Sequence, residues 1–343
     1  MNRRKIKNSE FRNIVSRKAL SLIVVACFLA SALYAVPQTQ PAPTTAKPPA
    51  AKKPKAPAKP AVALQKTFDT PEQAADAAIK AAESGDQKAL LDIFGPDAAD
   101  LISSGDAVED KEARERFLRL AHEKKVVAID PFDVHQANLT IGNEDWPFPI
   151  PIIHRKGRWL FDTKEGRIEV LARRVGENEL DAIAVCNGYV DAQIEYASED
   201  RDGNGVKEYA QRIISTPGRH DGLAWQKADG TWGGPVGEGV ARAIAEGYKV
   251  RTEPFHGYHF RILTSQGPDA PLGNLNYVVK GMMIGGFALI AWPDNYWVTG
   301  VKTFIVSNDG VVYQNDLGPN TEKLAAAIQA FNPGPGWEPV DED

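Results

Sequence analysis

Residues 178–212, NELDAIAVCNGYVDAQIEYASEDRDGNGVKEYAQR, contain the clearest structural signal of the 343-residue chain. The first half of the stretch carries apolar side chains at helical spacing, and the second half is an acidic loop interrupted by glycines. The apolar positions are Leu180, Ile183, Ala184, Val190, Ile194 and Ala197. Such a stripe is typical of a helix that packs one face against a core. The stretch therefore predicts a long core helix that leads directly into an acidic loop.

The acidic loop over residues 200–208 has the spacing of an EF-hand calcium loop. Side-chain oxygens occupy the first, third, fifth and ninth positions, the seventh position offers a carbonyl group, and glycine occupies the sixth, where such loops turn sharply. The predicted ligands are Asp200, Asp202, Asn204, Val206 and Glu208. The twelfth position is Gln211 in place of a bidentate Glu, so we expect weak calcium binding or closure by another residue, such as Glu199. The alternative is a solvated Asp/Gly turn without an ion.

The charge of the chain is distributed unevenly. Residues 1–65 carry twelve Lys or Arg and one acid, whereas residues 66–343 carry 28 basic and 44 acidic residues, a net charge of −16. A surface this acidic repels nucleic acid and anionic lipid. We therefore expect no nucleic-acid partner, and membrane contact only through the N-terminal segment or the basic linker that follows it.

The N-terminus is typical of an export signal. A basic region precedes an apolar run over residues 19–36, and Ala30-Ser31-Ala32 offers the small residues of a cleavage site. Three alternatives remain. The apolar run is long enough to span a bilayer, so it could be an uncleaved anchor. The chain could also be a lipoprotein attached at Cys27, or be exported through a twin-arginine signal at Arg3-Arg4. Ordinary secretion is favoured, which places the protein in the periplasm or cell envelope of a bacterium.

Composition divides the remainder of the chain. Residues 37–65 contain eight prolines among Ala, Lys, Thr and Gln, which predicts an extended tether. We expect a signal peptide over residues 1–36, this linker over 37–65, a first folded domain over 66–163, a second over 164–337, and an acidic tail over 338–343.

Helix signals precede strand signals in the first domain. Thr70-Pro71-Glu72 is a helix start, and further helices are predicted over residues 87–94, 98–102 and 110–125. Strands are predicted over residues 126–130, 137–141, 150–154 and 159–162, with a hairpin turn at Lys156-Gly157. Helices followed by a curved antiparallel sheet predict an α+β domain. The element order and the closing strand GRWLFDT (157–163) resemble the cone-shaped fold of the nuclear transport factor two superfamily, which serves as an enzyme pocket or as a binding module.

The second domain is predicted as a long helix packed on an antiparallel sheet. A helical segment over residues 164–175 precedes the long helix, one further helical turn is expected over 209–214, and short helices over 241–245 and 322–330. Strands are predicted over residues 258–264, 276–280, 286–292, 301–307 and 311–315, with a hairpin turn at Asn308-Asp309-Gly310. The whole chain is therefore expected to be an α+β protein.

Two family resemblances rest on these stretches. DWPFPIP (145–151), STPGRHDGLAW (215–225), HGYHFRILTSQGP (256–268), GGFALIAWP (285–293) and TFIVSNDGVVYQNDLGP (303–319) resemble a bacterial exported family known as domain of unknown function 2950. That resemblance covers residues 66–337 and implies an envelope location without an activity. The helix with its acidic loop and the strands of residues 287–313 are similar to the globular heads of pilins and pseudopilins, some of which carry calcium in the loop. Residues 166–177 are too charged to supply the hydrophobic half-helix that builds a filament.

No catalytic constellation and no cofactor-binding motif is recognised. His256 and His259 are three residues apart, so on a strand they point to opposite faces and are not expected to share a metal ion. Cys186, on the apolar side of the long helix, is expected to be a buried inert thiol. The seven tryptophans are compatible with a carbohydrate or peptide groove and equally with core packing.

Three functional hypotheses follow. The first is a non-catalytic envelope module that binds a protein or cell-wall partner, with calcium stabilising its loop. The second is an extracytoplasmic hydrolase or lyase that uses carboxylates in the first domain or between the domains, with Asp145, Asp162, Glu208 and Asp221 as candidates. The third is an accessory component of a pilus or a secretion-like apparatus.

Overall fold

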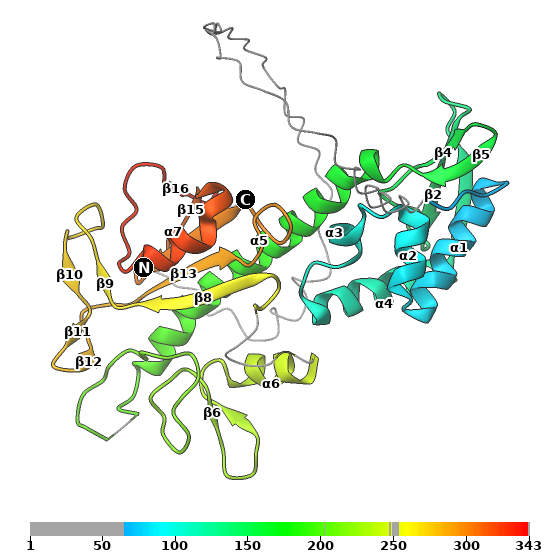
Figure 1. Ribbon diagram of the computed structural model, residues 1–343. Helices are drawn as coiled ribbons and strands as arrows, with labels where there is room; N and C mark the ends of the chain where they lie inside the picture. The colour runs from blue at the N-terminus through cyan, green and yellow to red at the C-terminus, as the bar shows by residue number, and fades with distance from the viewer. Residues whose placement is uncertain (1–64, 202, 247, 249–253, 342–343) are drawn as a thin grey trace, which may run out of the picture. The chain divides into compact units, whose positions relative to one another are not determined.

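The computed structural model describes residues 65–201, 203–246, 248 and 254–341. The predicted signal peptide and almost all of the predicted linker lie outside these described residues. The described chain combines helices with antiparallel sheets and belongs to one compact unit, residues 60–343 (Figure 1). The predicted α+β class is confirmed. No described helix has both the length and the apolar character needed to cross a membrane.

Four helices precede a five-stranded antiparallel sheet in the first part of the described chain. The helices are α1 (Pro71–Ser84), α2 (Gln87–Phe94), α3 (Ala99–Ile102) and α4 (Ala107–Glu123). The strands are β1 (Lys125–Ile129), β2 (Gln136–Ile141), β3 (Trp146–Pro147), β4 (Ile152–Arg155) and β5 (Arg158–Phe161), in the order β1-β2-β4-β5 with β3 beside β2. Helices and sheet enclose one hydrophobic core that includes Phe94, Leu139 and Phe161.

Local sequence signals explain most of these boundaries. The Thr70 side chain accepts the Gln73 N–H at 3.2 Å and caps α1, as predicted. Lys156 and Gly157 have φ values of 53° and 77°, which is the left-handed geometry of a two-residue hairpin turn between β4 and β5. The start of α4 was predicted three residues too late, because the cap is Asp106 and the helix begins at Ala107.

One continuous helix, α5 (Thr163–Tyr196), replaces the two helical segments predicted over this region. Asp162 caps it by accepting the Glu165 N–H at 3.3 Å. The helix contributes Val170 to the first core and Ala182, Cys186 and Tyr189 to a second core. At 1.5 Å per residue its 34 residues extend over about 51 Å. It is the long green helix of Figure 1.

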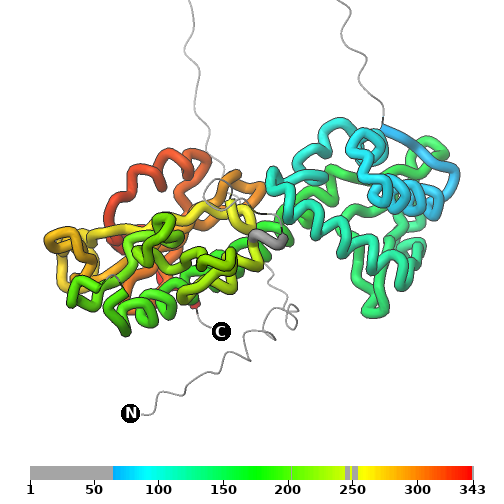
Figure 2. The backbone as a smooth tube through the Cα atoms, turned by 90° about the horizontal axis from the view of Figure 1, so that it is seen from below, coloured from blue at the N-terminus to red at the C-terminus, as the bar shows by residue number. Residues whose placement is uncertain are grey.

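The second core lies between α5 and a second antiparallel sheet. Its strands run in the order β16 (Glu338–Pro339), β15 (Val312–Asp316), β14 (Lys302–Ser307), β13 (Ala288–Pro293) and β8 (Tyr258–Leu263). β13 lies beside β8, the yellow strand of Figures 1 and 2. Nearly every residue of β13 and β14 is buried, so both faces of these central strands are covered, with α5 and α7 (Thr321–Ala327) packed against them.

Short hairpins and one further helix complete this part of the chain. They are β6 (Trp225–Gln226) with β7 (Trp232–Gly233), α6 (Gly237–Glu246), β9 (Ser265–Gln266) with β10 (Leu275–Asn276), β11 (Val278–Val279) with β12 (Met282–Met283), and the 3-10 turn η2 (Gly318–Asn320). The single strand predicted over residues 276–280 is therefore divided between β10 and β11.

The helical turn predicted over residues 209–214 is wrong. The Tyr209 N–H donates to the Met283 carbonyl at 2.8 Å, which makes an antiparallel bridge to β12. The Ala210 N–H and carbonyl are both bonded, at 2.8 Å each, to the buried side-chain amide of Gln193 on α5. These backbone N–H and carbonyl groups therefore form hydrogen bonds with residues distant in sequence and are not available for the hydrogen bonds of a helical turn.

Candidate functional site

The acidic loop after α5 is folded around the carboxylate of Asp200. Its Oδ1 accepts the N–H groups of Gly203 at 2.8 Å and Asn204 at 3.2 Å, and its Oδ2 accepts the Gly205 N–H at 2.9 Å. Gly203 and Gly205 have φ values of 75° and 83°, a left-handed conformation that glycine adopts without strain. Three backbone donors on one carboxylate hold the loop in a tight curl.

Asn204 and Glu208 continue this network. Asn204 Oδ1 accepts the Val206 N–H at 2.7 Å, and its Nδ2 donates to Glu208 Oε1 at 3.0 Å. The other oxygen of Glu208 accepts the Met283 N–H at 3.1 Å, which ties the loop to β12. Three of the predicted ligands, Asp200, Asn204 and Glu208, are thus connected by hydrogen bonds in one loop.

The residue at the twelfth position of the loop is used elsewhere. Gln211 Nε2 donates to the Gly281 carbonyl at 2.7 Å, in the turn between β11 and β12. Asp202 lies outside the described residues. Within the described part of the chain, no group of three or more His, Cys, Asp or Glu side chains is placed to hold a metal ion.

The carboxylates proposed for a hydrolase do not come together. Asp145 pairs with Lys124 at 2.7 Å, and Asp162 caps α5. Asp221 accepts the Thr216 N–H at 2.7 Å and its hydroxyl at 2.8 Å. Glu208 belongs to the acidic loop. Each of these side chains has a structural partner in a different segment.

A second group of acids, which the sequence analysis did not single out, lies at the start of α4. Asp106 is only 5 % exposed. Its Oδ1 caps the helix by accepting the N–H groups of Val108 at 3.0 Å and Glu109 at 3.1 Å. Its Oδ2 has no close hydrogen-bond partner among the described residues, although the Tyr248 hydroxyl interacts with this carboxylate. Glu109 Oε2 is also buried without a partner. Orphaned buried polar atoms are rare because each costs desolvation energy, so this pair needs a physical explanation.

Neighbouring serines account for the missing partners. The Asp106 N–H donates to Ser104 Oγ at 3.2 Å, so the serine occupies the place that Glu109 would take in a capping box. Asp110 accepts the Ser103 hydroxyl at 2.6 Å and both the N–H and the hydroxyl of Ser104 at 2.8 Å. These local donors serve Asp110 and leave none for Glu109 Oε2.

The environment of Glu109 favours its neutral form. Burial raises the pKa of Glu109 to about 7, and the negative charge of Asp106 acts in the same direction. Glu177 adds a smaller increase to this pKa, and the positive charges of His256 and Arg174 oppose it. A large fraction of Glu109 is therefore protonated at neutral pH.

His256 lies near this group in an unusual backbone conformation. Its φ is 48°, which is uncommon for a residue other than glycine and is frequent at functional positions. Its Nδ1 lies 2.5 Å from Asp181 Oδ2 on α5. His259 instead contacts Asp294 at 2.7 Å and stacks on Trp292. The two histidines therefore have separate acidic partners, and His256 precedes β8 instead of lying on it as expected.

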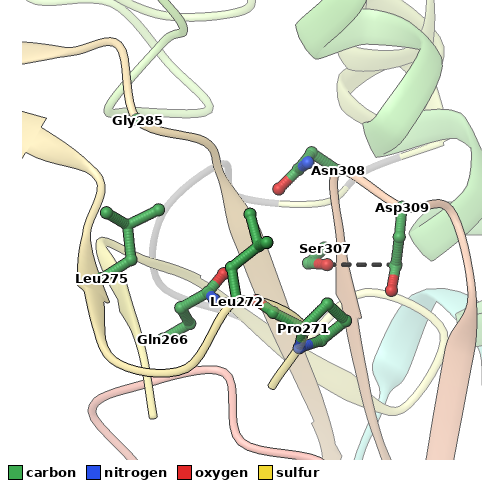
Figure 3. A pocket seen from close by; sticks show the side chains of 8 residues that line it. All are labelled: Gln266, Pro271, Leu272, Leu275, Gly285, Ser307, Asn308 and Asp309. Carbon is green, nitrogen blue, oxygen red and sulfur yellow. Dashed lines mark hydrogen bonds between the residues drawn. The ribbon is translucent and has the colours of Figure 1, made fainter. Parts of the chain in front are cut away.

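A small pocket lies where the β9–β10 hairpin faces the turn between β14 and β15 (Figure 3). It is lined by Gln266, Pro271, Leu272, Leu275, Gly285, Ser307, Asn308 and Asp309. Its volume of about 70 Å³ equals the share of roughly two water molecules in the liquid, whereas ligand sites usually exceed about 300 Å³. Leu272 on its rim is 95 % exposed. The pocket is too small for a cofactor or a sugar.

Cysteine and tryptophan side chains mainly serve packing. Cys186 is fully buried, as predicted, and burial raises its pKa to about 12. Trp292 lies on β13, within the strand predicted over residues 286–292. Trp146 is exposed with the Arg173 guanidinium 4.6 Å above its ring, and Trp297 is exposed in a separate segment.

Comparison with known proteins places the chain in a family. Residues 65–340 match the family model described as protein of unknown function DUF2950, as the sequence motifs predicted. Neither the curated proteins nor the solved structures include a match. The likeness to the cone-shaped superfamily and to pilin heads therefore stays a prediction. The matched region covers the full length of both cores, and the chain belongs to the DUF2950 family.

Proposed function

We propose that this chain is an exported, non-catalytic module of the cell envelope that binds a protein or cell-wall partner, with calcium stabilising its acidic loop. Export is supported by the basic and apolar N-terminal sequence, and envelope attachment by the lysine-rich linker. The absence of nucleic-acid binding is supported by the acidic charge of residues 66–343. The loop network of Asp200, Asn204 and Glu208 is the observation that carries the calcium proposal.

A calcium ion in this loop would act mainly on stability. Asp200, Asp202, Asn204 and Glu208 would supply side-chain oxygens and Val206 its carbonyl, the hard ligands that calcium prefers. Because Glu208 is also bonded to β12, the ion would fasten the end of α5 to that hairpin. The Gln211 side chain is bonded to a turn, so we expect the weak affinity of extracellular calcium modules, with a Kd of roughly 0.1 to 1 mM.

Thermal unfolding of the mature chain with EDTA and with millimolar calcium tests the site. An ion that binds only the folded state at about ten times its Kd stabilises by about 1.4 kcal/mol, so we expect millimolar calcium to raise the Tm by a few degrees. Asp200→Asn and Glu208→Gln should abolish this increase. Glu195→Gln, an exposed acid near the end of α5, is the control that should retain it. An unchanged wild-type Tm, with no heat of binding in calorimetry at millimolar calcium, contradicts the proposal.

A second candidate function is an extracytoplasmic hydrolase or lyase, and one observation favours it. Glu109, whose pKa is raised to about 7 by burial so that about half of it is protonated at neutral pH, lies near the imidazole of His256, which Asp181 contacts at 2.5 Å. A neutral carboxylic acid and an imidazole oriented by a carboxylate are the groups of general acid–base catalysis. This site replaces the scattered carboxylates suggested by the sequence.

A screen of the purified chain against cell-wall polymers, peptides and esters tests this second candidate. We expect the wild-type chain to turn over one of these substrates. Glu109→Gln and His256→Asn should each lower the rate by a factor of about 100 or more, which is the typical contribution of a general acid or base. Glu112→Gln, an exposed acid on α4, should keep the wild-type rate. Turnover that survives both substitutions at the site would exclude this cluster as its origin.

A further inference from the structure

We propose that strand β1 is a dimerisation edge, through which two copies of this chain join their first sheets into one continuous antiparallel sheet. β1 stands at the end of the order β1-β2-β4-β5, and among the described strands it pairs with β2 alone. The inference goes beyond the binding function proposed above and depends neither on the calcium loop nor on a catalytic site. It rests on the backbone, the exposure and the sequence of this strand.

Half of the backbone groups of β1 are directed away from β2. Directly after the strand, the Asp130 N–H donates to the Gln136 carbonyl at 2.8 Å, so the even-numbered residues turn their N–H and carbonyl groups towards β2. These directions alternate along a strand, and the same groups of Lys125, Val127 and Ile129 therefore point outward. No hydrogen bond to these outward groups is found within the described part of the chain. β1 thus offers a row of donors and acceptors to a further strand.

β1 is more open than the sheet edges with which it can be compared. At the opposite edge of the first sheet, Phe68 forms an antiparallel bridge with Trp159 of β5, through hydrogen bonds of 2.8 and 2.9 Å. β8, at one edge of the second sheet, has no exposed residue. In β1 every residue except Val127 is exposed. An open edge of this kind is a template for pairing with another chain.

The usual protection of an edge strand is missing from β1. Natural edges are guarded by outward charges, prolines or bulges. The charged residue of the strand, Lys125, forms an ion pair with Asp76 of α1, and Pro131 lies beyond the strand in the turn to β2. The other four residues are apolar, and Phe132 at the tip of the hairpin is 97 % exposed. Contact with water is unfavourable for such an edge, which favours a covered state.

The sequence of β1 is complementary to itself in the antiparallel direction. A twofold axis at Val127 sets Lys125 of each copy opposite Ile129 of the other, so that each outward N–H meets an outward carbonyl. Lys124, which precedes the strand, then lies opposite Asp130, which follows it. Parallel pairing would set like charges side by side. The order of charges therefore favours a second copy in the antiparallel direction.

The acidic charge of residues 66–343 does not oppose this contact locally. Residues 124–130 carry two lysines and one aspartate, and charges more distant than about 8 to 10 Å are largely screened at physiological salt. Lys124 contacts Asp145 at 2.7 Å, but an ammonium group has three donors, so it can also donate to Asp130 of the second copy. Two acidic chains can therefore approach along β1 with little local repulsion.

Pairing along β1 ends at two copies. The contact is twofold and uses the same strand in both copies, whereas a head-to-tail contact would grow into a fibre. The β5 edge of each copy is occupied by Phe68, so both ends of the joined sheet are covered. Five-residue strands form a small interface, and we expect reversible dimerisation with a Kd on the order of 10 µM.

Sedimentation velocity of the mature chain in EDTA, between about 1 and 200 µM, tests the proposal by the rise from one chain to two. Ile129→Pro removes one outward N–H from each copy and no bond to β2, a change that edge strands tolerate. It should raise the Kd roughly tenfold or more, because the pair loses a hydrogen bond on each side of the axis. Ile129→Ala is the matched control, which loses the same side chain, keeps the donor and should still dimerise.

Two further variants separate backbone pairing from other causes. Leu272→Ala alters a different apolar surface, where Leu272 is 95 % exposed on the β9–β10 hairpin, and should leave the Kd unchanged. Circular dichroism checks that each variant is folded. If Ile129→Pro unfolds, Ile129→Lys takes its place, because it sets a second lysine opposite Lys125 and should also prevent dimerisation.

Amide hydrogen exchange locates the contact independently. Exchange of residues 125–129 should slow as the wild-type concentration rises, and should stay fast in the variant that does not dimerise. A chain that stays monomeric up to about 200 µM would overturn the proposal. So would equal Kd values for Ile129→Pro and Ile129→Ala, or a dimer that Leu272→Ala abolishes. The experiment contains no calcium and no binding partner, so its failure leaves the function proposed above untouched.

Discussion

Gly300 shows how closely single residues are packed in the second core. A Cβ added at this position would lie 2.6 Å from Tyr258 Cζ. Tyr258 is fully buried and donates its hydroxyl hydrogen to the Lys302 carbonyl at 2.9 Å, so its ring has no room to move aside. The glycine is thus required by contact with the ring.

We therefore expect Gly300→Ala to destabilise the chain by about 1 to 3 kcal/mol, the usual cost of overpacking a core. Gly188→Ala is the matched control, because a Cβ at Gly188 on α5 meets no atom within 4 Å. That control should be neutral or stabilise by about 0.5 to 1 kcal/mol. Urea unfolding of both variants provides the comparison. Equal free energies of unfolding for Gly300→Ala and Gly188→Ala would show that the Tyr258 ring can move aside.

The acid pair at α4 shows what a sequence pattern leaves undetermined at a single residue. Asp106 and Glu109 have the spacing of a capping box, which is visible in the sequence. In the structure Ser104 accepts the reciprocal bond, and Glu109 Oε2 is buried without a hydrogen-bond partner among the described residues. The sequence signal would have located the helix start. The unpaired oxygen of Glu109 depends on which polar neighbour accepts the Asp106 N–H, and the sequence pattern does not specify that neighbour.

At the scale of elements, α5 differs most from the sequence expectation. A helical segment over residues 164–175 was predicted ahead of the long helix, yet the structure has one helix from Thr163 to Tyr196 that carries several charged residues before Val175. Those charged side chains have partners in the first part of the chain, for example Arg174 with the carbonyl groups of Asp100 and Leu101. Partners remote in sequence stabilise a segment whose local pattern is weak.

A proline substitution at position 176 tests whether α5 is one continuous helix or two. In a continuous helix Gly176→Pro removes an internal hydrogen bond and clashes with the preceding turn, so we expect a loss of about 3 kcal/mol or more. Gly176→Ala should be neutral or stabilising, because a Cβ there meets no atom within 4 Å. Circular dichroism with urea unfolding measures both variants. A proline variant as stable as wild type would mean that the helix is interrupted at this point.

At the scale of the whole molecule, the sequence identified the strands and helices better than their partners. The cap of α1 and most strands of both sheets follow from turn residues, capping residues and period-two patterns, whereas the two-residue strands β3 and β16 were not predicted. The pairing of β13 between β8 and β14 joins segments far apart in the chain, and no local pattern specifies it. The bridge of Tyr209 to Met283, which replaced a predicted helical turn, has the same origin.

The sequence by itself determined the α+β class, the family and the curl of the acidic loop. These features depend on neighbouring residues, through helical spacing, capping side chains and glycines at left-handed positions. The sequence predicted the long helix but not its buried face, because Leu180 and Ile194 of the predicted apolar stripe are 66 % and 57 % exposed. Only the tertiary structure decided that α5 serves two cores, that Gln211 is directed away from the loop, and that Glu109 Oε2 is buried within the electrostatic influence of Asp106. Burial and hydrogen-bond competition depend on residues distant in the chain, and they set both the orphaned oxygens and the raised pKa of Glu109.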